Sequence, residues 1–592
     1  MKRMKSKFCL LLSLVLGLAV TALAQTDTAR LVGTITDASD AVLPNATVAV
    51  TNTGTNRTVT VQTDDAGQYT VNALTAGKYH IDVKANGFKT TTADFTLEVS
   101  QVQTINLKLE TGEVSTTIDV TDAVPLVDTA TSNMGEVIQG REVTELPLNG
   151  RNFTQLALLA PGVTRGAYGD EASGGGSGTN SETFRNSETG GAALSANGLR
   201  PQADNFILDG VDNNDALVNT IIFFPPAEAI QEFRVNTSVA QAEFGRGGGV
   251  ILETSLKSGT NTLHGSTFLF RRSGFGAAHD YNATGPIQFR QAQFGGTLGG
   301  AIWKNKLFAF GDYQGRRQDQ PNGVETDTVP TDKMKNGDFS EFLGTNLTTT
   351  PAFCTGVPPN DGYIWDPTTC LPFGWNGATA TNVISNPNPV GLKYLQTFPE
   401  PNVANAVQNN YITERQQVRN FDDFDIRADF NATQKDQIFF RYSYAQDNFT
   451  VTNSLGSCCP SGFGSGDNID HARGATVGYT RTFGPAIVNE FHFGYITSTY
   501  GYNPPNIGQK LGQEVGIPGA NPTSLLGGQV LIGGNGNPQL DYQGDGGPYN
   551  VPQKLFQFTD SLSYSHGRHV FKYGATIGKR ELNFVQGNDA KG

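Results

Sequence analysis

The sequence is poor in charged residues, and after Val20 it has no long apolar run. Only 16% of its 592 residues are Asp, Glu, Lys or Arg. No later segment approaches the roughly 20 consecutive apolar residues that a membrane-spanning helix needs, so any later crossing of a membrane has to be made by strands closed into a barrel. The net charge of −13 argues against a nucleic acid or an anionic lipid surface as the main partner.

The patterns of catalytic and metal sites are missing as well. The seven histidines stand at positions 80, 264, 279, 471, 492, 566 and 569. None is followed by a glutamate three residues later, which excludes the short His and Glu pairing of a zinc peptidase. Asp209, Asp212 and Asp215 are spaced by three rather than two residues and no glutamate closes a calcium loop, so we interpret them as a polar turn.

Two further kinds of site can be excluded by the same comparison. The glycines of residues 244–250, "FGRGGGV", are not followed by the Lys-Ser or Lys-Thr of a phosphate-binding loop. No Ser/His/Asp or Cys/His constellation emerges elsewhere in the chain. We therefore expect no catalytic residue, no cofactor and no metal, and we expect that the protein is not an enzyme.

The N-terminus has the features of an export signal. Four basic residues lie within the first seven, an apolar run follows from Phe8 to Val20, and small residues precede Gln25. This order is typical of a cleaved signal peptide, predicted here for residues 1–24. A membrane anchor is the rival interpretation, but the run is shorter than the roughly 20 residues of a spanning helix. Export without a spanning helix leaves the periplasm or the outer membrane.

Cysteine is rare, with five in the whole chain. One of them, Cys9, leaves with the signal peptide, and the other four would meet an oxidising compartment that favours disulfides. Cys354 and Cys370 flank a loop rich in Pro, Gly and Asp, and their pairing is the preferred bridge. Cys458 and Cys459 could pair with each other or differently, and the sequence leaves both options open.

Glycine and aromatic residues are abundant instead, which favours β-structure with many turns. Between Arg30 and Glu110 about seven short alternating runs are separated by turn signals, which describes a small β-sandwich over residues 25–112. The segments "GTITDASDAVLPNATVAVTN" and "TDDAGQYTVNALTAGKYHIDVKANGF" resemble the carboxypeptidase regulatory-like domain, a transthyretin-like or Ig-like accessory sandwich.

Residues 113–130 are predicted to form an extended linker. Within it, Thr117, Ile118, Asp119, Val120 and Thr121 resemble the TonB box, a short exposed segment that pairs by strand addition with a TonB-type energy-transducing partner. The alternative is that these residues are only the last strand of the sandwich or a plain linker.

The pattern of apolar residues changes in residues 131–262. Apolar residues at spacings near 3.6, from Val137 and Ile138 to Leu159, predict short helices before Pro161. The following order of strand, Asp-Gly turn, helix, strand, Gly-rich turn and strand resembles the plug domain of TonB-dependent outer-membrane receptors. The residues that match the plug motif are Asp209, Gly210, Phe244, Gly245, Gly248, Gly249, Lys257, Ser258 and Gly259. Phe244 replaces the usual tyrosine of that motif.

From residue 263 to 592 long alternating strands carry aromatic residues on one face. In 424–430 Phe424 and Ile426 share one face of the strand, while Asp425 and Arg427 share the other. This alternation is typical of a transmembrane β-barrel, whose outer face contacts lipid and whose interior is polar. By the same reasoning Phe268 and Phe270 are expected to face lipid. The segments between strands, notably 318–417 and 500–552, are long and irregular.

The order of these strands resembles the Oar-like branch of the TonB-dependent receptors, which carries the same N-terminal sandwich. We count about nine or ten candidate strands after His264, whereas barrels of this family have about 22 strands, so a partial barrel in a fragment is expected. The fold class is therefore mainly β: a sandwich, a small α/β plug and a partial antiparallel transmembrane barrel.

The resemblance implies a plug-gated, energy-coupled transporter in the outer membrane. Its expected partners are a TonB-type protein, outer-membrane lipid and an unidentified extracellular ligand, and no nucleic acid. The alternative is a non-transporting surface protein whose long loops adhere to cells or matrix.

Overall fold

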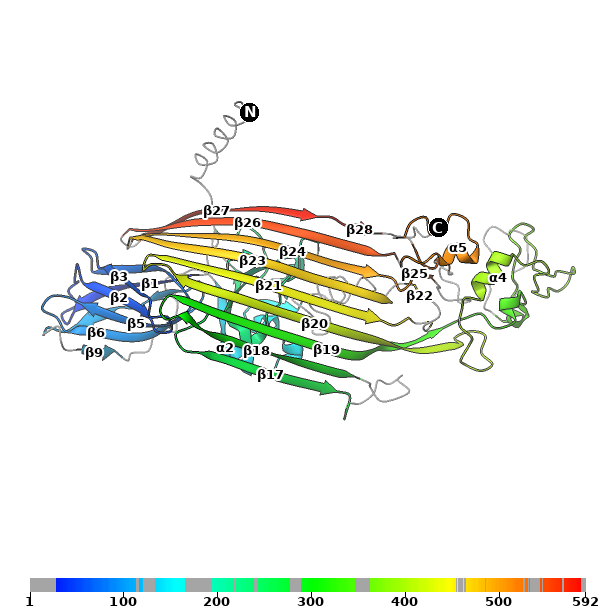
Figure 1. Ribbon diagram of the computed structural model, residues 1–592, viewed down its shortest axis with the longest axis horizontal. Coiled ribbons are helices and arrows are strands. Elements are labelled where there is room, and N and C mark those ends of the chain that lie inside the picture. Colours follow the sequence, from blue (N-terminus) through cyan, green and yellow to red (C-terminus); the bar gives the residue numbers. More distant parts are fainter. Residues whose placement is uncertain are drawn as a thin grey trace, which may run out of the picture.

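The chain folds into three units: a sandwich at one end of the elongated molecule, a central unit, and a long sheet that lies against the central unit (Figure 1). The computed structural model describes residues 28–112, 117–120, 134–165, 194–217, 219–238, 243–276, 289–345, 362–453, 455, 461–462, 465–484, 486–524, 527–530, 532, 544–545, 547–566 and 569–586. The expected signal peptide 1–24 lies outside these residues, as do Cys354, Cys458 and Cys459. Within the described part, no helix combines the length and apolarity needed to cross a membrane.

The first unit is the expected β-sandwich. Its strands are β1 (Ala29–Asp37), β2 (Thr47–Asn52), β3 (Thr58–Gln62), β4 (Gln68–Leu74), β5 (Gly77–Lys84), β6 (Thr90–Leu97), β7 (Val102–Thr104) and β8 (Leu107–Leu109). β4, β1 and β7 form one sheet, with β8 also paired to β1, and β3, β2, β5 and β6 form the other. Alternate apolar residues of both sheets are fully buried between them, among them Leu31 and Val71 of the first sheet and Val48 and Ile81 of the second, as the period of a strand requires.

The TonB-box-like segment extends the second sheet of the sandwich. Residues Thr117–Val120 form strand β9, which pairs in parallel with β6 and is the outermost strand of the sheet. Thr121 lies outside the described residues. The part of the expected linker that is described thus belongs to the sandwich sheet, and whether it binds a partner stays a prediction.

The second unit, residues 134–256, is called the central unit. Its main sheet has the order β10 (Met134–Gln139), β15 (Ile230–Ser238), β16 (Ile251–Leu256), β13 (Asn205–Leu208) and β14 (Val211–Asp212). Its helices and its small second sheet are α2 (Gly140–Glu145), η1 (Asn149–Arg151), η2 (Phe153–Leu159), η5 (Pro201–Ala203), η6 (Ala227–Ala229), β11 (Val163–Arg165) and β12 (Leu194–Ala196). Phe153, Phe233 and Leu252 lie in its core.

One predicted helix begins later than its pattern suggested. Val137 and Ile138 lie in strand β10, opposite Arg234 and Phe233 of β15, and the helix starts only at Gly140. The prediction was wrong for these two residues because a short apolar run is compatible with both the helical and the strand period. Pairing with a distant strand decides between the two structures.

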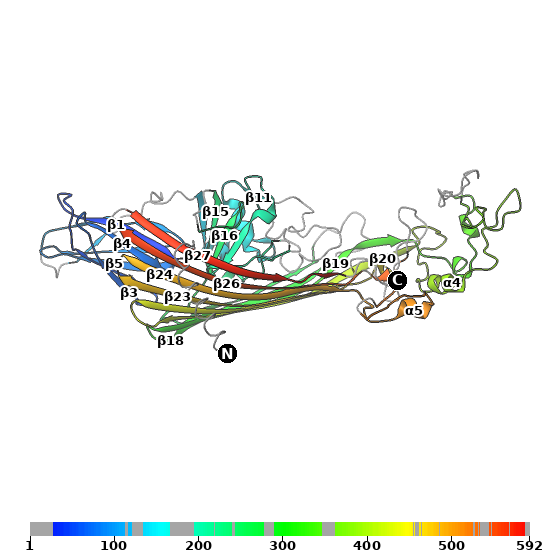
Figure 2. The same cartoon turned by 90° about the horizontal axis from the view of Figure 1, so that it is seen from above.

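The third unit is a ten-stranded antiparallel sheet, called the wall. Nine strands follow one another in chain order, with β28 beside β26. They are β17 (His264–Ser273), β18 (Arg290–Trp303), β19 (Leu307–Asp327), β20 (Tyr411–Asn431), β21 (Asp436–Val451), β23 (Gly466–Gly484), β24 (Ile487–Asn503), β26 (Tyr549–His566), β27 (His569–Leu582) and β28 (Val585–Gln586). Figure 2 shows the wall curving around the central unit. The expected mainly β chain with a partial antiparallel barrel is confirmed.

The two faces of the wall can be assigned from its contacts. Arg427 and Arg441 reach the central unit, so their face is the inner one, and Ile426 on the opposite face is half exposed. Phe268 and Phe270 also lie on the inner face, because the guanidinium of Arg151 in the central unit stands 5.1 and 4.3 Å from their ring centres. The expectation that these two rings face lipid was wrong, and Leu269 takes that side.

The long segments at the other end of the wall are folded into a cap. β19 and β20 extend well into the region expected to be irregular. Between the strands lie η7 (Met334–Asn336), η8 (Ser340–Phe342), α4 (Pro389–Leu395), α5 (Leu511–Val515) and the paired strands β22 (Ser461–Gly462) and β25 (Gly544–Asp545). The cap has a buried cluster of its own that includes Val329, Tyr394 and Phe398. Cys370 of this cap is disulfide-bonded, and its pairing with Cys354 stays a prediction.

Candidate functional site

A buried carboxylate joins the central unit to the wall. Asp209 lies in the tight turn between β13 and β14, with a positive φ of 46°, and its neighbour Gly210 has a φ of 74°. A Cβ on Gly210 would lie 3.3 Å from the ring of His492, so a glycine lets this turn approach the wall. Asp209 is fully buried, and one of its oxygens accepts a hydrogen bond from the backbone N–H of Leu256 at 3.1 Å.

Two wall arginines complete the site around Asp209. Nη1 of Arg427 donates to Oδ1 of Asp209 at 2.9 Å, and Nη1 of Arg441 donates to Oδ2 at 2.9 Å. The two arginines stand directly opposite each other on β20 and β21. Two like charges at such a cross-strand position repel each other, and the carboxylate between them offsets that repulsion. We call Asp209, Arg427 and Arg441 the lock.

Polar neighbours hold the lock arginines in place. Nε of Arg427 donates to Asp429 at 3.1 Å, and Nη2 of Arg441 donates to the hydroxyl of Thr476 at 3.1 Å. Both guanidiniums are buried. Removing one partner of a buried ion pair leaves an uncompensated charge, which is far more costly than replacing both partners.

An apolar contact surrounds the lock. Leu208, Val211 and Phe223 of the central unit pack against Phe310, Phe421 and Ile496 of the wall, among others. The wall is thinned where these side chains meet it, since a Cβ on Gly494 would lie 2.3 Å from Val211. The central unit is therefore fitted to this wall by shape as well as by charge.

Replacing Gly494 with valine is expected to cost about 1–3 kcal/mol of stability, the usual cost of overpacking a filled core. The measurement is the unfolding midpoint of the full-length protein in detergent. Gly578→Val is the matched control, because the nearest atom to a Cβ there is 4.0 Å away. Equal midpoints for the two variants would show that the apolar contact with the wall does not exist as described.

The other acidic residues of the predicted polar turn also contact the wall. Asp212 forms ion pairs with Arg246 at 3.1 Å and with Arg580 of β27, and Asp215 accepts a hydrogen bond from Gln553 of β26 at 2.6 Å. These contacts use the carboxylates without a cation. Among the described side chains, no group of three or more His, Cys, Asp or Glu could hold a metal ion.

The structure brings only part of the predicted plug motif to the wall. Ser258 donates to Asp429 at 2.6 Å, and a Cβ on Gly259 would lie 2.4 Å from the carbonyl oxygen of Ala309. Lys257 donates to the carbonyl of Glu228 within the central unit at 2.8 Å. The remaining motif residues lie away from the lock: Phe244, Gly245, Gly248 and Gly249. Gly249 packs against Asp204, where a Cβ would lie 2.2 Å from its carboxylate.

A second contact, which no sequence pattern indicated, joins the sandwich to the central unit. The turn after β6 inserts there: the N–H of Val99 donates to Glu232, and the hydroxyl of Ser100 donates to Glu253 at 2.8 Å. Arg234 in turn donates to the carbonyl of Ser100 at 3.1 Å. We call this set of contacts the clasp. Its residues are spread over the chain, so only their positions on two facing edges could have revealed them.

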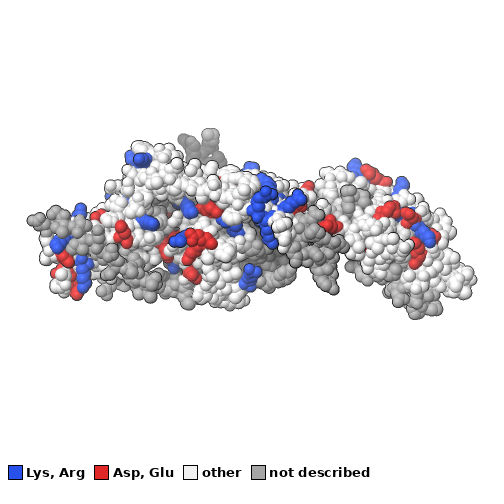
Figure 3. All heavy atoms as spheres, turned by 90° about the horizontal axis from the view of Figure 1, so that it is seen from below, with Lys and Arg blue, Asp and Glu red and all other residues white. Residues whose placement is uncertain are grey.

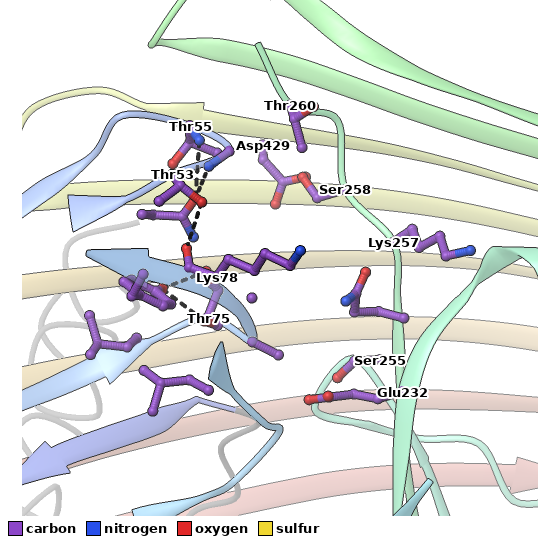
Figure 4. A pocket seen from close by; sticks show the side chains of 18 of the residues that line it. Thr53, Thr55, Thr75, Lys78, Glu232, Ser255, Lys257, Ser258, Thr260 and Asp429 are labelled. Atoms are coloured by element: carbon purple, nitrogen blue, oxygen red, sulfur yellow. Dashed lines mark hydrogen bonds between the residues drawn. The ribbon is translucent and has the colours of Figure 1, made fainter. Parts of the chain in front are cut away.

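A cavity of about 690 Å³ opens where all three units meet. Figure 4 shows that Lys78 of the sandwich reaches across it toward the central unit, where Glu232 and Ser255 line the opposite side. Asp429 of the wall lines it beside Ser258. The cavity thus adjoins both the clasp and the lock.

The clasp is expected to weaken as the pH rises. Burial raises the pKa of Glu232 to about 8 and that of Glu253 to about 7, both from 4.5. A carboxyl whose pKa is higher in the docked state binds its proton more tightly there. Docking of the sandwich should therefore be strongest near pH 5 and lose this contribution as the pH rises through 7 to 8.

The distance between spin labels on β3 and on the turn between β20 and β21 measures this docking. We expect one short distance at pH 5 and a broader, longer distribution at pH 9. The variant with Glu232→Gln and Glu253→Gln should stay docked over the whole range. A distance that responds to pH equally in that variant would contradict the assignment to these two carboxyls.

Comparison with known proteins agrees with this architecture. Residues 255–592, more than half of the chain, match the family model described as outer membrane beta barrel domain, and residues 30–110 match the carboxypeptidase regulatory-like domain. The chain is 27% identical over 316 residues to the TonB-dependent transporter Oar of Myxococcus xanthus, which covers 50% of this chain and 27% of that protein.

Solved structures of outer-membrane proteins are similar at low identity. The outer membrane transporter YddB from Escherichia coli matches 76% of this chain and 48% of its own, with 9% identity and a TM-score of 0.44. The siderophore receptor PirA from Acinetobacter baumannii matches 78% of this chain and 49% of its own, with 10% identity and a TM-score of 0.40. The chain thus spans about half the length of these structures and about a quarter of the curated relative. The chain belongs to the outer membrane beta-barrel family, in the Oar-like branch of the TonB-dependent receptors, and its place is the outer membrane.

Proposed function

We propose that this protein is a plug-gated transporter, in which the central unit is the plug and energy supplied from the periplasm displaces it. The observation that supports this most is the lock. A buried carboxylate of the central unit is held by two buried arginines of the wall, so the unit is fixed in one position across the lumen.

The sandwich is placed to carry a pull to the plug. The TonB-box-like residues 117–120 lie at the outer edge of its sheet, and the clasp holds the same domain to Glu232 and Glu253 of the plug. An exposed strand edge is a template for strand addition by a partner. A TonB-type protein that pairs there would pull on the sandwich and, through the clasp, on the plug.

The cavity at the three-unit junction gives the transported solute a place to leave the lumen. It lies at the end of the wall where the strands are joined by short turns, beside the sandwich. Its lining combines hydroxyl, amide and charged side chains with a few apolar ones. Displacement of the plug would connect this cavity with the lumen, while the sandwich stays attached through residues 98–101.

A second candidate function is adhesion by a surface protein that does not transport. The folded cap favours it, because the long segments have their own buried cluster rather than lying loose over the wall. A rigid cap can present a fixed surface to a cell or to matrix.

Energy-dependent uptake separates the two functions. Cells that make the full-length protein, or the protein without residues 117–121, are grown in a complex medium, and the medium components that they deplete are compared with and without a protonophore. We expect depletion of one solute class that requires both the segment and the proton gradient, with unchanged adhesion. If the uptake of every tested solute persists after the deletion, the transport proposal is overturned and adhesion remains as the function.

A further inference from the structure

A hollow of about 390 Å³ on the wall is lined by four arginines. It lies where β17 ends, and the arginines are Arg271, Arg272, Arg290 and Arg317. Figure 3, seen from below, shows blue side chains gathered midway along the molecule, with red side chains to one side of them. A cluster of cations is unexpected in a chain with a net charge of −13, so it calls for a partner of opposite charge.

Most of the hollow belongs to the outer face of the wall. Arg316 contacts the ring of Phe421 on the inner face, 5.4 Å from its centre, so its neighbour Arg317 points outward. Arg271 and Arg317 stand in one row across three strands, with Ala292 between them. The short side chain of Ala292 leaves the floor of the hollow open between two long cationic side chains.

The charges in the hollow are only partly compensated. Arg317 is fixed by Asp422, with Nη2 at 2.8 and 3.0 Å from the two carboxylate oxygens. Asp319 stands opposite Arg290 in the register but forms no ion pair with it. Within the described part of the chain, Arg271 and Arg290 have neither an ion pair nor a side-chain hydrogen bond. The hollow therefore offers two free guanidiniums beside one that is held rigid.

The hollow lies at the edge of the apolar band of the wall. On the same outer face, Leu263, Leu269 and Leu298 are exposed toward the short turns. Eight residues separate Leu263 from Arg271, about 26 Å along a strand at about 3.3 Å per residue. With the strand tilted by about 40°, this length spans about 20 Å of the roughly 25 Å apolar belt of such a barrel, and the long side chain of Arg271 covers the rest to the headgroup level on the side of the cap.

We propose that this hollow binds the phosphate groups of an anionic lipid of the outer leaflet. Guanidinium groups form charge-assisted, often bidentate hydrogen bonds with phosphate. Arg271, Arg290 and Arg317 alternate to the outer face of the wall, so a lipid headgroup reaches them from the side while its acyl chains lie on the exposed leucines below. The site is independent of the plug, and it gives the barrel a preferred lipid neighbour at one position of its circumference.

Binding of diphosphoryl lipid A to the full-length protein in neutral detergent tests the proposal. Native mass spectrometry would count bound lipid over a titration, with inorganic phosphate as competitor. We expect saturable binding that falls at least about tenfold in the variant with Arg271→Gln and Arg290→Gln, since a hydrogen bond to a charged group is worth about that factor. Lipid binding by the Arg271→Lys variant should be intermediate, because an ammonium group keeps the positive charge but cannot form the bidentate hydrogen bonds of a guanidinium.

Arg473→Gln serves as the control, because Arg473 is an exposed arginine on β23 away from the hollow. It should bind lipid as the unaltered protein does, and all variants should keep the same unfolding midpoint. Equal lipid binding by the double variant would overturn the site. Displacement of the lipid by millimolar inorganic phosphate would overturn the lipid as its ligand and indicate a site for free phosphate.

Discussion

The Asp209→Ala variant is expected to lose about 3–5 kcal/mol of stability, the usual cost of removing one partner of a buried ion pair. Asp209 is fully buried, and both arginines that it binds are buried too. The change removes the ion-pair partner of Arg441 and leaves the facing Arg427 with Asp429 alone. The measurement is denaturant unfolding of the full-length protein, followed together with entry of a large hydrophilic antibiotic into cells that produce it.

Two controls separate the lock from a general effect of losing an aspartate. Asp436→Ala removes a partly exposed ion pair with Arg481, 3.0 Å apart in the same sheet, together with hydrogen bonds from Thr433 and Tyr479, and should cost about 1–2 kcal/mol, less than the loss of Asp209. Adding Arg441→Met to Asp209→Ala should recover part of the loss, because the uncompensated charge is then gone. If both aspartate variants were equally stable, the lock would not hold the plug.

Deletion of residues 117–121 is expected to abolish energy-driven movement of the plug while leaving the folded protein intact. Strand β9 is the outermost strand of its sheet and pairs on one side only within the described residues, so its loss removes few contacts. The large effect is on coupling, because these residues are the segment that resembles the TonB box. Unfolding midpoints of the two proteins should agree within the error of the measurement.

A shuffled segment is the sharper control for that deletion. Replacing residues 117–121 by the same five residues in another order keeps the length of the connection and its composition. If the register of strand pairing matters, this variant should be as inactive as the deletion. Full activity of the shuffled variant would assign the role to connection length instead.

The sequence predicts the two faces of the wall well, but it does not predict which face looks inward. Period-two alternation separates Ile426 from Arg427 without ambiguity, and charge places Arg427 inside. The aromatic character of Phe268 and Phe270 predicts the lipid side for both residues. Only the position of Arg151, more than a hundred residues earlier, shows that these rings line the lumen.

The lock, too, could be predicted from the sequence only in part. The Asp-Gly turn at 209–210 is visible in the sequence, and its resemblance to a plug motif directs attention to it. Its partners lie 218 and 232 residues later, and the strand of Arg427, β20, also carries Arg415 and Arg419. The strand register and the position of the plug together place Arg427 and Arg441 beside Asp209. Neither the register nor the plug position can be predicted from a short stretch of sequence. The clasp was missed for the same reason.

The most direct test of the account is cysteine labelling under the plug. Ala445 is buried on the inner face of the wall, in the apolar cluster that Leu208 and Val211 enter, so an Ala445→Cys variant reacts with a small hydrophilic maleimide only when the plug moves away. Labelling is compared in energised and protonophore-treated cells, with the protein that lacks the added cysteine as background. We predict labelling in energised cells that disappears with the protonophore and with deletion of residues 117–121. Equal labelling in all three conditions would contradict an energy-driven plug.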